Sequence, residues 1–401
     1  MRKNVYSEPP PHPLICGEAP EVSRAAAAYR VVGVMSGTSL DGVDLALVLL
    51  HPPAAESGEM WGWKLEAAQT VPLPPGWRQF FSDVTGKQTP NAQELVQADV
   101  EFGGYLGEIA QIFLASVGGA LPDFIASHGH TLFHQPQQSS PQPGFTFQLG
   151  HGGTLAAAAG LPVVCDFRST DVALGGQGAP LVPLGDRLLF PEFAICLNLG
   201  GIANLSVERA SGGRRAYDVC ACNQLLNALA AEAGLPYDDG GRLARAGQPV
   251  PALRVALDAP VFFTQPAPKS LGREWVEAHS LAALAEFSAA SLPNRLRTTT
   301  DHVAGQLAVA IRAALAEAAP AAGRQVLATG GGAFNSYLIE RLRAELAGVA
   351  EVVVPAPEIV NFKEAIIFAL LGVLRWRGEV NTLASATGAR RDSSGGAIFA
   401  P

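Results

Sequence analysis

The sequence is short of charged residues, and of lysine in particular. Only 16% of its 401 residues are charged and only five are lysine, whereas 48% are hydrophobic. So apolar a composition is typical of an ordered protein with a large core and argues against disorder. The formal net charge is −8 and the chain shows no basic stripe, which argues against nucleic acid as a partner.

Cysteine is also scarce, and its pattern implies no disulfide framework. The five cysteines are odd in number and widely spread: Cys16, Cys165, Cys196, Cys220 and Cys222. Residues 1–30 lack the continuous apolar core of a signal peptide, and no run of about 20 apolar residues predicts a transmembrane helix. We therefore expect a cytoplasmic protein with no membrane as partner.

The N-terminal segment differs in composition from the rest of the chain. Residues 1–29 contain the run EPPPHP, which cannot lie inside a helix or a central strand. We interpret residues 1–29 as a leader that precedes the folded part. The first strand of the fold is then expected to start near residue 30.

Three segments share one design, a short buried-type strand followed by a glycine-rich polar turn. They are VVGVMSGTSLDGVDLALV at 31–48, AICLNLGGIANLSV at 194–207 and VLATGGGAFNSYLIERL at 326–342. The first two continue as a second strand and the third continues as a helix, because its apolar residues fall at helical spacing. Two hairpins about 160 residues apart predict a duplicated α/β architecture that faces a shared cleft.

Helical periodicity fills much of the sequence between these segments. One helix is predicted over about 92–117, with Val96, Val100, Tyr105, Ile109 and Phe113 near one face. A second is predicted over about 302–318. A third, over 363–376, is apolar nearly all round, which is typical of a buried helix that crosses between domains.

The turn SGTSLDG at 36–42 offers hydroxyl and backbone N–H donors that could wrap an anion such as phosphate. The chain has no GxxxxGK[ST] motif, so this is not a P-loop, and with five lysines a phosphate site must use backbone, hydroxyls, arginine or metal. Taken alone, the turn could equally be an ordinary hairpin. Three such turns in this order describe the actin-like ATPase fold of sugar kinases, an α/β fold with two lobes around a central cleft.

Longer motifs make the resemblance specific. They are GVMSGTSLDGVD at 33–44, SHGHTLFHQP at 127–136, DFRSTDVALGGQGAPLVP at 166–183, NLGGIANLS at 198–206, KSLGREW at 269–275, GGGAFN at 330–335 and TGA at 387–389. In this order they resemble the anhydro-N-acetylmuramic acid kinase family over almost everything from residue 31 to 401. The resemblance implies ATP and Mg²⁺ as cofactors. It also implies cleavage of the 1,6-anhydro bridge by water and phosphorylation of the freed O6, in peptidoglycan recycling.

The resemblance also assigns site residues. The family's catalytic base falls on Asp218 in AYDVCACN, where Cys220 and Ala221 replace the usual glycine and proline, so the shape of this loop is open. A glutamate near the sugar, the second residue assigned to catalysis, falls on Glu364 in NFKEAIIFALL. Asp41 is assigned to Mg²⁺ through water. The nucleotide-binding residues are expected to be Gly37, Thr38, Ser39, Leu40, Asp41, Gly42, Val43, Asp44, Gly200, Gly201, Gly330, Gly331 and Gly332.

Three further residues are assigned to the sugar: His128, Arg168 and Asn223. Arg168 follows Asp166 and could pair with the substrate's lactyl carboxylate or brace Asp166 or Asp171. The H-G-H-x-x-x-H pattern at 128–134 has no accompanying carboxylate or cysteine set, so we interpret it as sugar-contacting or structural rather than as a zinc site.

We expect a first lobe of residues 30–186 plus about 380–401 and a second lobe of 187–379. Three alternatives stay open on the sequence: a kinase of the same fold for another amino sugar, a non-catalytic module that senses sugar or ATP, and a hydrolase that needs no ATP. The resemblance also leaves open whether the protein is a homodimer.

Overall fold

The computed structural model describes residues 28–37, 40–54, 60–86, 90–136, 143–319 and 323–401. Thr38, Ser39 and residues 1–27 of the expected leader lie outside the described residues. Tyr29, which the sequence prediction placed in the leader, is the first residue of strand β1 and is buried. Over the described ranges, no helix is long and apolar enough to cross a membrane.

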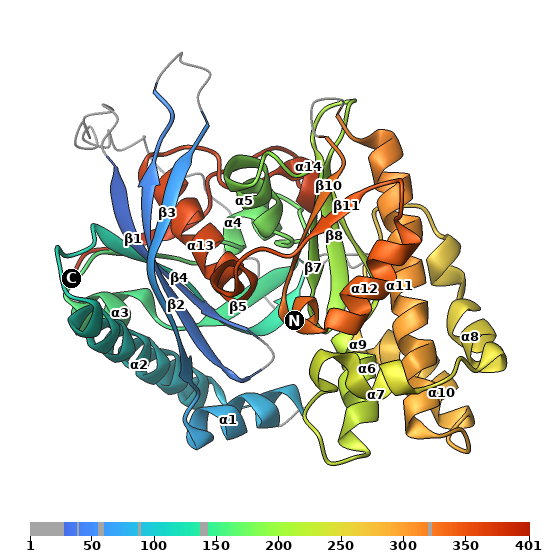
Figure 1. The fold of residues 1–401 in the computed structure, drawn as a ribbon. Coiled ribbons are helices and arrows are strands. Elements are labelled where there is room, and N and C mark those ends of the chain that lie inside the picture. Colours follow the sequence, from blue (N-terminus) through green and yellow to red (C-terminus); the bar gives the residue numbers. More distant parts are fainter. Residues whose placement is uncertain (1–27, 38–39, 55–59, 87–89, 137–142, 320–322) are drawn as a thin grey trace, which may run out of the picture.

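Two β-sheets carry the fold (Figure 1). The first has the order β12-β6-β4-β1-β2-β3, with β5 paired to β4, and the second has the order β11-β10-β7-β8-β9. Their bounds are β1 Tyr29–Ser36, β2 Gly42–His51, β3 Gly62–Pro72, β4 Phe124–Gln135, β5 Phe145–Leu149, β6 Val163–Cys165, β7 Ile195–Leu199, β8 Ile202–Glu208, β9 Arg214–Ala221, β10 Gln325–Thr329, β11 Glu351–Val353 and β12 Ala397–Phe399.

The two sheets repeat one topology. In the first, β1, β2 and β3 form an antiparallel meander and β4 runs parallel to β1 on its other side. In the second, β7, β8 and β9 form the same meander and β10 runs parallel to β7. The predicted duplicated actin-like α/β fold is thus confirmed, and both predicted hairpins are present as β1–β2 and β7–β8.

Helices cover the sheets on both sides. The longer ones are α1 Pro75–Thr85, α2 Ala92–Val117, α3 Gly152–Ala159, α5 Val182–Leu189, α6 Asn223–Ala231, α8 Pro251–Asp258, α11 Leu292–Glu317, α12 Ser336–Glu345 and α13 Pro357–Trp376. The shorter ones are α4 Ser169–Ala173, α7 Arg242–Ala246, α9 Arg273–Trp275, α10 Ala282–Glu286 and α14 Ala384–Thr387. Short 3₁₀ helices are η1 Asp239–Gly241, η2 Val261–Thr264 and η5 Gly331–Phe334, and η3 Val276–Leu281 is a π-helix.

The prediction for α2 gave both ends correctly and its buried face only in part, because Ile109 and Phe113 are buried as predicted. Val96 and Val100 are exposed, and the buried residues centre on Phe102 and Leu106. The reason is the contact with α3: a Cβ on Gly103 would lie 2.6 Å from the carbonyl oxygen of His151. Glycines, which a hydrophobic pattern does not count, therefore mark the face that packs closely.

Helix α11 starts ten residues before the predicted residue 302. Its first turns carry the run Thr298–Thr299–Thr300, which lacks an apolar helical pattern. Each of these threonine hydroxyls donates to the carbonyl four residues earlier, which satisfies polar groups inside a buried helix.

Helix α13 lies between the two sheets (Figure 1) and packs mainly on β1, β2 and β4, with further contacts to α5 and β10. Glycines on its neighbours permit this approach: a Cβ on Gly33 of β1 would lie 1.9 Å from the Ala365 carbonyl oxygen, and one on Gly185 of α5 would lie 2.4 Å from Ile367. Its residues join a core that includes Cys196 and Leu327 of the second sheet. The helix assigned from sequence to the second lobe therefore lies at the junction of both.

Candidate active site

Asp218 lies on β9, opposite Asn204 of β8. Its Oδ2 accepts hydrogen bonds from the Leu271 backbone N–H at 2.8 Å and from the Ser270 hydroxyl at 3.1 Å. Its own N–H donates to the Lys269 carbonyl at 2.9 Å, so the KSLG segment is held against the carboxylate. Burial raises the pKa of Asp218, and the two hydrogen bonds oppose that rise. The result is a half-buried carboxyl held in one orientation.

The departure at Cys220 is absorbed by the core. The Cys220 and Cys222 side chains are fully buried in the second-lobe core, and burial raises the pKa of both thiols. The four described cysteines are free. An inert buried thiol next to Asp218 alters packing behind the carboxylate, and it leaves the hydrogen bonds to Ser270 and Leu271 in place.

A second group of charged residues gathers where α13 meets β2. The Asp44 carboxylate accepts a hydrogen bond from the Thr70 hydroxyl at 2.6 Å. Burial, with the nearby charges of Asp41 and Glu364, raises the pKa of Asp44 to about 6, against the lowering effect of Thr70. Burial likewise raises the pKa of Glu364, although Lys363 and Arg168 oppose the rise. Neighbouring buried carboxyls with raised pKa values are typical of a functional site.

Arg168 is fixed by uncharged partners. Its Nε donates to His128 Nε2 at 2.9 Å and its Nη1 donates to the Gly178 carbonyl at 2.6 Å. His128 Nδ1 lies 2.8 Å from the Gly129 carbonyl, so the proton sits on Nδ1 and Nε2 is the acceptor. Burial, aided by the charge of Arg168, holds the pKa of His128 well below its usual range. His128 therefore acts as a neutral support that orients Arg168.

Asp166 and Asp171, the alternative partners of Arg168, are bonded elsewhere. Asp166 accepts from the Ser169 hydroxyl at 2.5 Å. The Asp171 carboxylate accepts from the Gly178 N–H and from the Thr387 hydroxyl, both at 2.7 Å. The C-terminal TGA motif thus ties down the GGQGAP loop that also holds Arg168, a structural use for a motif that sequence alone left unexplained.

The first glycine-rich turn is anchored at its start. Ser36 Oγ lies 3.0 Å from Nδ1 of His130, and the His130 ring stacks on Phe81 at a centroid distance of 3.7 Å. Burial lowers the pKa of His130 to about 4, so the ring is neutral at pH 7. Leu40 in the turn has φ of 60°, a left-handed conformation that few side chains adopt. The spacing SHGHT did not reveal this anchor, since Ser36 is 94 residues distant from His130.

The second and third turns lie side by side. Gly330 has φ of 80°, and a Cβ there would lie 2.3 Å from Asn198 Oδ1. Asn223 is bonded to the second turn, because its backbone N–H donates to the Gly200 carbonyl at 3.2 Å and its Nδ2 donates to the Leu199 carbonyl at 2.9 Å. It also lies close to the third turn, since a Cβ on Gly332 would be 3.0 Å from its Oδ1. The structure therefore groups Asn223 with the glycine-rich turns rather than with Glu364 and Arg168.

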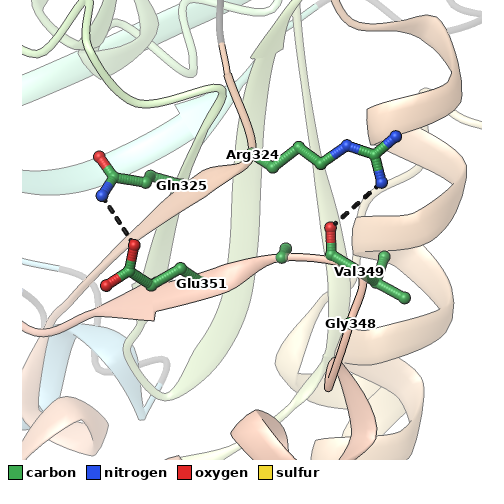
Figure 2. A pocket seen from close by; sticks show the side chains of 6 residues that line it. Arg324, Gln325, Gly348, Val349 and Glu351 are labelled. Carbon is green, nitrogen blue, oxygen red and sulfur yellow. Dashed lines mark hydrogen bonds between the residues drawn. The ribbon is translucent and has the colours of Figure 1, made fainter.

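Two surface hollows lie away from these residues. One has a volume of about 420 Å³ and lies at the start of β10. Figure 2 shows its lining residues, among which Arg324 donates to Val349 and Gln325 donates to Glu351. This hollow is at the opposite end of the strand from Gly330. A groove of about 790 Å³ runs between α1 and α2 beside Trp77 and Phe80. Neither contains a candidate site residue.

No set of three or more histidine, cysteine, aspartate or glutamate side chains that could hold a metal occurs in the described part of the chain. The neighbouring charges of Asp41 and Asp44 still fit Mg²⁺ bound with a nucleotide, because Mg²⁺ usually takes one or two carboxylates plus phosphates and water.

Asp44→Asn is expected to stabilise the protein at pH 8 by about 1 to 3 kcal/mol. An acid whose pKa is raised by folding favours the folded state below its unfolded pKa, and that advantage is lost as the pH rises through about 6. The amide removes the cost of burying a carboxylate and can still accept from Thr70. Denaturant unfolding at pH 4 and pH 8 measures the gain, which should nearly vanish at pH 4.

Glu108→Gln, on the exposed side of α2, is the control and should leave the free energy of unfolding unchanged at both pH values. A pH-independent effect of Asp44→Asn would contradict the assignment of the cost to the buried charge.

The chain is similar to one family of known proteins along nearly its whole length. Residues 29–401 match the family model described as anhydro-N-acetylmuramic acid kinase. Curated proteins of that description from Streptomyces coelicolor and Vibrio cholerae are 35% and 36% identical, each over 92% of this chain and over 93% and 98% of their own lengths. A solved ROK family glucokinase from Streptomyces griseus, in complex with glucose and AMPPNP, is 13% identical with a TM-score of 0.35, over 85% of this chain and 98% of that chain.

Proposed function

The chain belongs to the anhydro-N-acetylmuramic acid kinase family, and from this membership we propose that it uses ATP and water to convert 1,6-anhydro-N-acetylmuramic acid to N-acetylmuramic acid 6-phosphate. The reaction serves peptidoglycan recycling, and we place it in the cytoplasm. The observation that carries the proposal is Asp218, a half-buried carboxylate on β9 held by Ser270 and Leu271.

Asp218 is the general base of this reaction. Its Oδ2 is oriented by two donors, which leaves Oδ1 to accept a proton. As the water oxygen attacks C1, its proton passes to Asp218, the C1–O6 bond breaks, and O6 takes the γ-phosphoryl group while ADP leaves. A raised pKa makes this carboxylate a stronger base than an exposed aspartate.

Glu364 and Arg168 bind the sugar where α13 meets the first lobe, and His128 supports Arg168. Arg168 supplies a buried positive charge suited to the lactyl carboxylate, and neutral His128 keeps it in place without competing for that charge. Glu364, at the same junction, is suited to accept hydrogen bonds from sugar hydroxyls or the amide N–H.

The three glycine-rich turns bind ATP. The turns at Gly37–Gly42 and at Gly200 and Gly201 would hold the phosphates through backbone N–H groups, and Gly330, Gly331 and Gly332 would border the adenosine. Asn223 braces the second turn through its hydrogen bonds to Leu199 and Gly200. Asp41 and Asp44 would hold Mg²⁺, which neutralises phosphate charge when bound.

Two observations separate this reading from its alternatives. A module that only senses ligands has no use for a carboxylate with a raised pKa and fixed orientation, as Asp218 is. A hydrolase without ATP has no use for three glycine-rich turns. A kinase for another amino sugar would share all these features, and the substrate range distinguishes it.

The reaction in ¹⁸O-water should place the label at C1 of a 6-phosphorylated sugar, because water and not phosphate opens the bridge. Mass spectrometry of the product from ATP and anhydro sugar measures it, with N-acetylglucosamine as the control substrate. Unlabelled sugar phosphate would overturn the mechanism, and turnover without ATP would favour the hydrolase.

A further inference from the structure

One of the five lysines lies where a lysine is unusual, inside the apolar helix α13. Lys363 is 5% exposed, and its Nζ lies 2.8 Å from Oδ1 of Asp186 on α5, which is 3% exposed. Burial lowers the pKa of Lys363, but the facing Asp186 carboxylate outweighs this and raises it. The pair is therefore a charged ion pair shielded from solvent.

The ion pair is part of a network that reaches the second sheet. The Ser206 hydroxyl on β8 donates to Asp186 Oδ2 at 2.5 Å. Arg214 on β9 donates from Nε and Nη2 to the Ser206 oxygen at 3.1 and 2.9 Å, and its Nη2 lies 4.0 Å from Asp186. Although burial raises the pKa of Asp186, the charges of Lys363 and Arg214 bring it below the usual range. Lys363 thereby connects α13 to β8 and β9 through α5.

The residue next to Lys363 is Glu364, and the two point in different directions. Successive residues of an α-helix are about 100° apart around its axis. Lys363 faces Asp186 and the second sheet, whereas Glu364 lies near Asp44 and Arg168 of the first lobe. A rotation of α13 about its axis would move both side chains together, so fixing Lys363 also fixes Glu364.

Stability alone does not account for this pair. The cost of removing two charges from water is large, and well-packed apolar residues in place of a buried ion pair are often neutral or stabilising. The aliphatic neighbours of Lys363 on α13 and α5 already form a continuous core. What an ion pair adds over apolar packing is one defined geometry.

We propose that Lys363 is a positioning residue for sugar binding: its ion pair with Asp186 sets the rotation of α13 and thus the place of the Glu364 carboxylate. The inference rests on the proposed function, since it names what holds a sugar-binding residue of that site. Because the network starts on the second sheet and Glu364 faces the first lobe, it also links the positions of the two lobes at the sugar.

The test compares Lys363→Met with the double variant Lys363→Met/Asp186→Leu. The single variant leaves a buried carboxylate without its main partner and should lower the melting temperature. The double variant replaces both charges with apolar side chains of similar size, so its melting temperature should return to near the wild-type value. If the pair positions Glu364, kcat/KM for the anhydro sugar should stay about 10-fold to 100-fold low in both variants while KM for ATP stays within about twofold.

Lys363→Arg and Arg30→Met are the matched controls. Lys363→Arg keeps a positive charge opposite Asp186, so kcat/KM for the anhydro sugar should stay close to the wild-type value. Arg30→Met removes a partly buried ion pair with Glu66 at the far end of β1 and should lower the melting temperature without moving the sugar KM. If the double variant has both the wild-type melting temperature and the wild-type kcat/KM for the anhydro sugar, the positioning role is overturned.

A crystal structure of the double variant gives a readout that needs no turnover. A displaced or rotated Glu364 carboxylate supports the positioning role, and an unmoved one overturns it. Absence of sugar-dependent ADP release in the wild type would instead refute the proposed function, so the two failures are distinguishable.

Discussion

Asp218→Asn is expected to lower kcat for sugar phosphorylation by at least about 100-fold and to leave ATP affinity nearly unchanged. The amide keeps the size of the carboxylate and can still accept from Leu271 and Ser270. It cannot take a proton from water, and positioned general bases contribute about 10² to 10⁴ in rate. Coupled ADP release gives kcat, and calorimetry gives the affinity for ATP.

ATP affinity should hold because Asp218 and the nucleotide turns use different contacts. Asp218 is bonded to the KSLG segment, whereas the Gly200 carbonyl accepts from the Asn223 N–H and the Gly330 N–H donates to the Val360 carbonyl. Because these contacts are different, a change at Asp218 is expected to lower kcat without changing the affinity for ATP. A loss of both together would indicate a folding defect instead.

Ser270→Ala is the matched control for Asp218→Asn. It removes one of two hydrogen bonds to Oδ2 and leaves the Leu271 N–H in place, so it should lower kcat by much less than the asparagine. An Asp218→Asn protein that keeps more than about a tenth of wild-type kcat would rule out the base assignment.

The sequence predicts those parts of the fold that local pattern determines. The strand–turn–strand segments at β1–β2 and β7–β8 were found because short apolar runs flank glycine-rich turns. The third turn and α12 followed from helical spacing after Gly330. The assignment of Asp218 came from a motif, and the structure adds the reason for its orientation, the donors on Ser270 and Leu271.

What sequence could not supply are contacts between distant residues. Lys363 and Asp186 lie 2.8 Å apart across two helices, and no local pattern pairs them. The only local signal is a lysine inside an apolar helix, which indicates that a buried acidic partner must lie opposite it. Asn223 was assigned to the sugar as the asparagine of the family motif that Asp218 opens, and its hydrogen bonds to Leu199 and Gly200 could not be read from that motif.

Gly33→Ala is expected to destabilise the protein by about 3 kcal/mol or more and to weaken sugar binding as well. A Cβ at this position would lie 1.9 Å from the Ala365 carbonyl oxygen and 2.8 Å from its carbonyl carbon. Both are backbone atoms of α13, so no side-chain rotation relieves the overlap. The helix must move away from β1, and Glu364, the residue before Ala365, moves with it.

Whether Gly33→Ala stabilises or destabilises the protein depends on two opposing free-energy contributions. Alanine restricts the unfolded chain more than glycine, which favours folding by about 0.4 to 1 kcal/mol where the site is open. At Gly33 the displacement of a buried helix outweighs this, because inserting atoms into a packed core costs about 1 to 3 kcal/mol and more when the backbone must shift. Denaturant unfolding measures the first effect, and KM for the anhydro sugar measures the second.

Gly76→Ala on α1 is the control, because nothing lies within 4 Å of a Cβ at that position. In a helix the same substitution should stabilise the protein by about 0.5 to 1 kcal/mol. Opposite signs at the two glycines would show that contact with α13, and not loss of glycine flexibility, decides the outcome at Gly33. If Gly33→Ala were as stable as wild type with unchanged sugar KM, then α13 would not be held against β1 as the structure has it, and the place of Glu364 would have to be revised.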